Sequence, residues 1–168
     1  MAKTATTSDD RLFWGRPAQV RTARRFVVAG LAGCPVAVDR DVVALLVSEL
    51  VTNAVVHSAS GWEDGTLLVG YQLTRDGLDP ERLCLRVEVR DLGGPGHPRR
   101  CQHALESSGA RGLEVVEALA SRWGVGRHPR GRVVWFELEL ALVDRDGGAW
   151  SDRAAEVPAR RALLVHGR

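Results

Sequence analysis

The stretch that most constrains the fold is residues 41–61, DVVALLVSELVTNAVVHSASG. We expect Asp39 or a neighbour to cap the start of a helix here, and Ser60 and Gly61 to end it. Its aliphatic side chains recur at helical spacing and cover more than one stripe, which predicts a helix buried over most of its circumference. These side chains are Val42, Leu45, Leu46, Val47, Leu50, Val51, Ala54 and Val55.

Three polar residues, Glu49, Asn53 and His57, share one face of this helix. They are spaced four residues apart, so each lies about 40° round the axis from the last. Because an unpaired buried carboxylate is costly, Glu49 must have a partner, lie at the edge of a cleft or face a ligand. We interpret this face as the candidate active surface. The alternatives are a salt bridge from Glu49 to an arginine, and a packed core or helix-end role for His57.

Length and composition are those of one soluble globular domain, with 168 residues, 45% of them hydrophobic and 26% charged. The net charge is only +2 and the arginines are scattered, so we expect neither a nucleic-acid nor a membrane partner. The N-terminus has no apolar signal core, and no apolar stretch is long enough to span a bilayer. We therefore expect a cytoplasmic protein.

Several chemistries are disfavoured by residue type. Lys3 is the only lysine, which excludes a Walker A phosphate loop and Schiff-base chemistry. His97 and His103, with Cys101 between them, do not have zinc-ligand spacing. The three cysteines are odd in number and are expected to be reduced thiols, and none lies at a strand-to-helix nucleophile elbow.

The remaining periodicities predict an α+β two-layer sandwich, with helices packed on one face of a mixed, mostly antiparallel sheet. Residues 12–143 would form the domain, and residues 144–168 a C-terminal tail with a short helix at 159–165. The other expected elements are a flexible polar tail (1–11), an amphipathic helix (16–31), a hairpin of two strands (66–73 and 83–89), a long loop read as a lid (92–108), a helix (112–123), a turn-rich segment (124–131) and a strand (133–143).

Three stretches stand out among these expected elements. They are SELVTNAVVHS on a helix, VEVRDLGGPG at the end of a strand, and SSGARGLEVVEAL at the start of a helix. The set resembles the N, G1 and G2 boxes of the GHKL ATPase superfamily. Within it, the chain looks like the anti-sigma-factor serine kinases and the actinobacterial ATP-binding regulatory proteins. The resemblance runs from about Arg16 to Leu140 and implies the Bergerat-type ATP-binding fold.

The resemblance implies ATP and Mg²⁺ as cofactors and assigns a role to each motif. Glu49 would be the catalytic carboxylate that orients the nucleophile, and Asn53 an oxygen ligand of Mg²⁺. Asp91 would accept the exocyclic amine of adenine, although Asp-x-Gly taken alone also fits a turn. Backbone approach to the base would need Gly93 and Gly94, and phosphate would be bound where a helix begins, at Gly109, Arg111, Gly112 and Leu113.

The resemblance implies a protein serine/threonine kinase that transfers the γ-phosphate of ATP to a protein antagonist, or an ATP-dependent binder of a sigma factor. One departure supports a different class of function. The first glycine of the family's Gly-x-Gly is Ala110 here, which favours a non-catalytic interaction module that binds nucleotide weakly or not at all. A homodimer is compatible with either reading. The arginines of the first helix, Arg21, Arg24 and Arg25, are either a solvated face or a contact surface.

Overall fold

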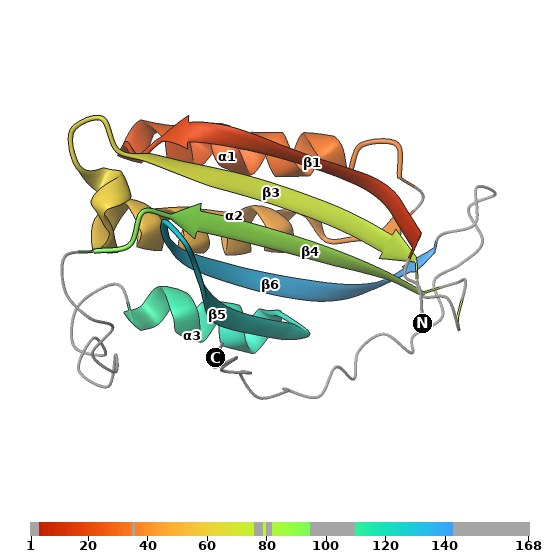
Figure 1. Ribbon diagram of the computed structural model, residues 1–168. Coiled ribbons are helices and arrows are strands. Elements are labelled where there is room, and N and C mark those ends of the chain that lie inside the picture. The colour runs from red at the N-terminus through yellow and green to blue at the C-terminus, as the bar shows by residue number, and fades with distance from the viewer. Residues whose placement is uncertain (1–3, 35, 76–78, 80–81, 95–109, 143–168) are drawn as a thin grey trace.

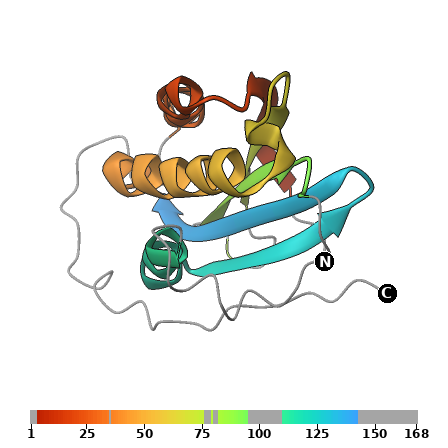
Figure 2. The ribbon, with the colours of Figure 1, turned by 90° about the vertical axis from the view of Figure 1, so that its left-hand side faces the viewer.

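The computed structural model describes residues 4–34, 36–75, 79, 82–94 and 110–142. Within these residues three helices lie on one face of a six-stranded sheet (Figures 1 and 2). This is the two-layer α+β arrangement that the sequence predicts. The helices are α1 (Pro17–Gly30), α2 (Arg40–His57) and α3 (Ala110–Leu119).

The strands follow the order β1-β3-β4-β6-β2, with β5 added on β6, and every described pair is antiparallel. The predicted hairpin is confirmed by the pairing of β3 with β4, in which Val69 lies opposite Val89. The strands are β1 (Thr4–Trp14), β2 (Val36–Ala37), β3 (Thr66–Arg75), β4 (Arg82–Asp91), β5 (Arg122–His128) and β6 (Gly131–Leu142).

Helix α2 is the centre of the core, as its sequence predicts, but Leu45, one of the side chains expected to be buried, is 41% exposed. The carboxylate of Asp39 caps it by accepting the N–H groups of Asp41 and Val42, at 2.9 and 3.3 Å. The helix ends at His57, earlier than predicted, and residues 59–61 instead form a short 3₁₀ turn, η1 (Ala59–Gly61). Six of its side chains are fully or almost fully buried: Val43, Leu46, Val47, Leu50, Val51 and Ala54.

The prediction of a flexible tail over residues 1–11 is wrong for residues 4–11, which belong to strand β1. This strand pairs with β3 along its length and buries Phe13, whose ring centroid lies 5.9 Å from that of Phe26 on α1. Residues 8–11 are exposed and polar on both faces of the strand, so they show no hydrophobic alternation. Charges on an edge strand discourage pairing with a further chain.

The segment 124–131 was predicted to be turn-rich, but most of it belongs to strand β5. Gly124 and Gly126 have poor strand propensity, yet they pair with Trp135 and Val133 of β6. Pairing with the long strand β6 therefore stabilises the extended conformation of these glycines. The predicted helix 112–123 also ends earlier, at Leu119.

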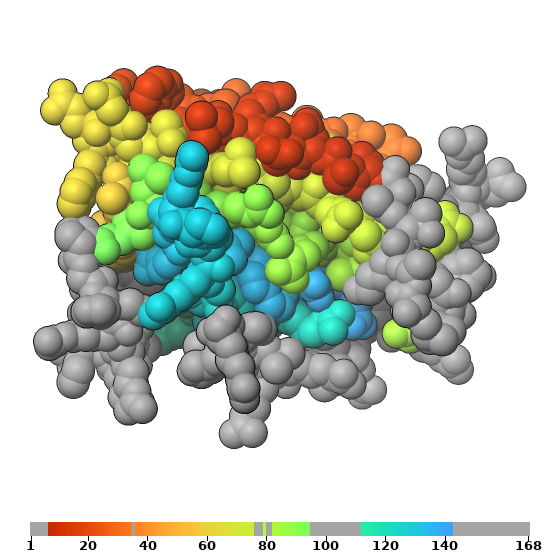
Figure 3. Space-filling model, viewed as in Figure 1, coloured from red at the N-terminus to blue at the C-terminus, as the bar shows by residue number. Residues whose placement is uncertain are grey.

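Among the described residues no helix covers the other face of the sheet, which we call the open face, and Figure 3 looks onto it. The side chains of β4 alternate in accordance with this arrangement. Leu85, Val87 and Val89 are buried under the helices, while Arg86 and Glu88 point to the other face of the sheet. No helix in the described part of the chain is both long and apolar enough to cross a bilayer. Most of the predicted lid 92–108 and the predicted helix 159–165 lie outside the described residues.

Candidate functional site

A cavity of about 190 Å³ lies between α2 and α3. The helical spacing of the polar residues on α2 turns one face of that helix toward the first turn of α3. The residues that line the cavity are Glu49, Thr52, Asn53, Val56 and His57 from α2, and Gly112 and Leu113 from α3. The structure therefore brings together four of the predicted site residues, Glu49, Asn53, Gly112 and Leu113.

Glu49 and Asn53 face this cavity without a hydrogen bond or ion pair to any other described residue. Both side chains are only partly exposed. The alternative in which a salt bridge to an arginine explains Glu49 therefore finds no support in the described part of the chain. A carboxylate and an amide oxygen one helical turn apart remain available to a ligand.

Gly112 brings α3 close to the carboxylate of Glu49. A β-carbon built at position 112 would collide with Glu49 Oε2. The glycine therefore leaves the space in which the Glu49 side chain lies. Because Gly112 is in the first turn of α3, backbone N–H groups and the positive end of the helix dipole are near the same cavity.

Asp91, predicted to read the base, is buried at the end of β4 with a side chain that is 1% exposed. Its carboxylate is held by Arg132 of β6, through Nη2 at 2.9 Å and Nε at 3.2 Å from Oδ2. Its Oδ1 accepts the N–H of Gly93 at 2.7 Å. Asp91 does not line the cavity between α2 and α3, but Arg132 Nη2 also donates to His57 O, at 3.4 Å, and so connects the two places.

Further backbone contacts fix the end of β4 against the end of α2. Ser60 Oγ accepts the N–H of Leu92 at 2.9 Å, and Gly93 O accepts the N–H of Ala59. Gly94 lies beside the last turn of α2, since a β-carbon there would be 3.9 Å from His57 O. Gly93 has a φ of 70°, a conformation that favours glycine.

Sequence reasoning did not single out Arg132, which holds the predicted site residue Asp91. In the register of β4 and β6 it lies directly opposite Asp91. Alternation along residues 133–143 predicts which side chains of this strand face the helices, but not which residue of β4 each one meets. Among the other predicted residues, Gly109 lies outside the described residues, and Arg111 is placed in the first turn of α3 without a described side chain.

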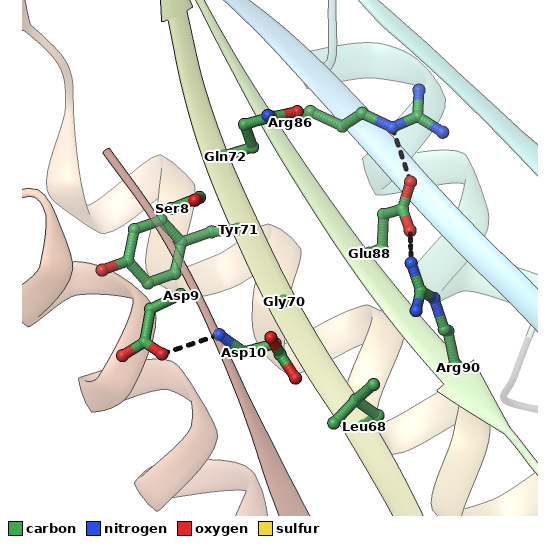
Figure 4. Close-up of a pocket in the computed structure, with 10 residues that line it drawn as sticks. All are labelled: Ser8, Asp9, Asp10, Leu68, Gly70, Tyr71, Gln72, Arg86, Glu88 and Arg90. Atoms are coloured by element: carbon green, nitrogen blue, oxygen red, sulfur yellow. Dashed lines mark hydrogen bonds and ion pairs between the residues drawn. The ribbon is translucent and has the colours of Figure 1, made fainter. Parts of the chain in front are cut away.

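A second hollow, of about 370 Å³, lies on the open face of the sheet above Gly70 (Figure 4). Its charges are largely paired: Glu88 lies between Arg86 and Arg90, at 2.7 and 2.9 Å. Burial raises the pKa of Glu88, but the hydrogen bonds and charges of the two arginines outweigh it and hold that pKa below its usual value of 4.5. Arg86 also stacks on Trp135, with its guanidinium carbon 4.0 Å from the ring centroid. This hollow is on the opposite face from Glu49 and Asn53.

An antiparallel sheet covered by helices, with an acid and an amide facing the start of a second helix, defines a domain suited to binding a polyphosphate. The chain belongs to the histidine kinase-like ATPase domain family, whose family model matches residues 13–138 of the 168. This confirms the GHKL-type superfamily predicted from the three motifs. A search of curated proteins gave no match.

The residues present fit the ATP and Mg²⁺ that this domain family implies. The cavity supplies two oxygen-bearing side chains, Glu49 and Asn53, and Mg²⁺ in nucleotide sites is commonly held by one or two protein oxygens together with phosphates and water. Gly112, in the first turn of α3, leaves room for the Glu49 carboxylate beside this cavity. At about 190 Å³ the cavity is smaller than most complete ligand pockets.

Proposed function

We propose that the chain is an ATP-binding regulatory protein that acts as a serine/threonine kinase on a partner protein. The observation that carries this proposal is the convergence of Glu49, Asn53 and the first turn of α3 on one cavity. Bound ATP would supply the γ-phosphoryl group. The partner that we expect is an anti-sigma antagonist protein, with a sigma factor as a second binding partner and a homodimer as the assembly.

The chain's own residues would act mainly by positioning and by charge neutralisation. Asn53 would hold Mg²⁺ through its amide oxygen, while the backbone N–H groups at the start of α3 would bind phosphate oxygens. Glu49, which has no other described partner, would accept a hydrogen bond from the attacking serine or threonine hydroxyl and so orient it. Asp91, together with Gly93 and Gly94, would form the base end of the site.

Isothermal titration of Mg²⁺-ATP into the full chain tests nucleotide binding. We expect Asn53→Ala to weaken binding about tenfold or more, because it removes a metal ligand. Gln72→Ala removes the same kind of amide from the opposite face of the sheet and should bind like the parent. Absence of binding by the parent, or equal binding by Asn53→Ala, would argue against the nucleotide site.

Phosphoryl transfer is tested separately with γ-labelled ATP and candidate antagonist proteins. Glu49→Gln keeps the size of the side chain but removes its charge, so we expect transfer to slow about a hundredfold while ATP binding changes little. Glu139→Gln, an exposed change on β6, is the matched control. Unchanged transfer by Glu49→Gln would contradict the role of Glu49.

Two observations favour the second candidate, a non-catalytic interaction module of the same fold. The Asp91 carboxylate is already held by Arg132, and Ala110 replaces a glycine of the phosphate loop. A parent chain that binds its protein partner equally well with and without Mg²⁺-ATP, and transfers no phosphate, would support that function.

A further inference from the structure

Among the described residues that line the cavity between α2 and α3, Thr52 is the only one with a hydroxyl group. It follows Glu49 by three positions on α2, so the two residues are about 4.5 Å apart along the helix axis and about 60° apart around it. Side chains at this spacing are neighbours on a helix surface. Thr52 therefore lies beside the proposed catalytic carboxylate, on the side away from Asn53.

The hydroxyl of Thr52 is also free of the backbone contact that other hydroxyls of this helix make. Ser48 within α2 donates to Ala44 O, and Ser58 at its end donates to Ala54 O, each at 2.7 Å. Hydroxyls on helices commonly bond in this way to the carbonyl four residues back. Thr52 Oγ1, in contrast, has no hydrogen bond with any described residue, and the residue is exposed. Its hydroxyl is thus available to a ligand in the cavity.

The same residue type is what the proposed reaction consumes. The phosphoryl acceptor proposed above is a serine or threonine hydroxyl that Glu49 orients. Thr52 supplies such a hydroxyl within the chain itself, next to the same carboxylate. An acceptor held beside the reacting groups has an effective concentration far above that of a partner protein in solution. Without a partner, Thr52 is therefore the hydroxyl acceptor that the described part of the cavity offers.

We propose that Thr52 is a site of autophosphorylation. In this step Thr52 Oγ1 forms a bond to the γ-phosphorus of ATP, the bond from that phosphorus to the oxygen bridging to the β-phosphorus breaks, and ADP leaves. The hydroxyl proton passes to Glu49 and from there to water. This inference rests on the proposed kinase function and names a second acceptor for the same site.

Phosphorylation at this position would inhibit the site that performs it. Phosphothreonine carries a charge of about −1.5 to −2 at neutral pH, and it would stand beside Glu49 in a cavity of about 190 Å³. Like charges at this helical spacing repel each other, and a further polyphosphate would meet both of them. The modified chain should therefore bind Mg²⁺-ATP more weakly than the unmodified chain does.

The test incubates the full chain, without a partner protein, with Mg²⁺ and γ-labelled ATP and maps the label by mass spectrometry. We expect acid-stable label on Thr52, at a rate per chain that is independent of protein concentration, as a step within one chain requires. Thr52→Val should reduce the label about tenfold or more, because it removes the acceptor oxygen. Thr22→Val removes an exposed threonine from α1 and should label like the parent. Isothermal titration should show Mg²⁺-ATP binding to the labelled chain weakened about tenfold or more.

Acid-labile label on His57, the other nucleophile among the described lining residues, would overturn the inference, as would equal labelling of Thr52→Val and the parent. If Thr52→Val does not fold by circular dichroism, Thr52→Ser keeps a hydroxyl and should carry the label as phosphoserine at position 52. A parent that binds no ATP, or transfers phosphate to no acceptor, contradicts the proposed function itself. Transfer to a partner protein without label on Thr52 contradicts only this inference.

Discussion

Gly112 on α3 lies against the carboxylate of Glu49 on α2, so closely that a β-carbon at position 112 would collide with Oε2. The position of the proposed catalytic carboxylate is therefore set in part by the absence of a side chain on the neighbouring helix. Glu49 is held by packing on that side, since it has no hydrogen bond to a described residue.

We expect Gly112→Ala to reduce phosphoryl transfer about tenfold or more without loss of stability. The atom that must move is the far end of a flexible side chain, and alanine favours a helix over glycine by about 1 kcal/mol. A shift of about 1 Å in a catalytic group is enough to slow transfer strongly. Transfer assays and thermal denaturation measure the two effects. In a Glu49→Ala background, Gly112→Ala should have no additional effect on transfer, and a further loss there would contradict this explanation.

Arg132→Ala should destabilise the fold by about 3 kcal/mol, because it leaves the buried Asp91 carboxylate without its ion pair. The same variant also removes the contact between β6 and His57 O. Urea denaturation measures the loss, with Arg130→Ala as the control for removing a nearby exposed arginine. Equal stability of the two variants would contradict the structural role of the pair.

The ion pairs of Glu88 predict a pH-dependent contribution to stability. Because the folded-state pKa of Glu88 is lowered below 4.5, its contribution is present above that pH and is lost as the pH falls through the folded-state pKa. We expect Glu88→Gln to cost about 1 kcal/mol at pH 7 and progressively less below pH 4.5. Urea denaturation at several pH values checks this, and a difference that stays constant with pH would count against it.

Two glycines of the sheet should respond oppositely to alanine. At Gly131 a β-carbon would overlap the backbone of residues 91–93, so Gly131→Ala must displace the end of β4 and should cost about 2 kcal/mol or more. At Gly70 the nearest atom is Asp10 Cβ at 3.4 Å, and Gly70→Ala should be neutral or stabilising by up to about 1 kcal/mol. Thermal denaturation of both variants measures the change in stability, and equal losses of stability would contradict the contacts described for Gly131.

The sequence predicts α2 well because its signals are local. The aliphatic period, the Asp39 cap and the four-residue spacing of Glu49 and Asn53 lie within one stretch, and the structure contains each of them. The hairpin of β3 and β4 is predicted for the same reason, since alternation and a turn signal are both short-range.

What the sequence does not predict depends on partners that are distant along the chain. Residues 8–11 are polar on both faces, and they are a strand because β3 pairs with them. Gly124 and Gly126 are in a strand because β6 supplies a partner. Arg132 meets Asp91 only through a strand register that joins residues 41 positions apart. Propensity and periodicity carry no information on such pairings.

Strand β6 is the last described strand of the chain, yet it lies inside the sheet, paired with β4, β5 and β2. During synthesis on a ribosome, β4 therefore emerges with one edge unpaired. Strand β2 can pair only after β6 has been made, because Val36 lies opposite Leu142, more than a hundred residues later in the chain. The nascent domain cannot complete its core until this strand has left the exit tunnel. Pairing between strands so distant in the sequence is slow, and until it occurs an unpaired strand edge is exposed to aggregation. We therefore expect folding in the cell to depend on chaperones that bind the incomplete sheet.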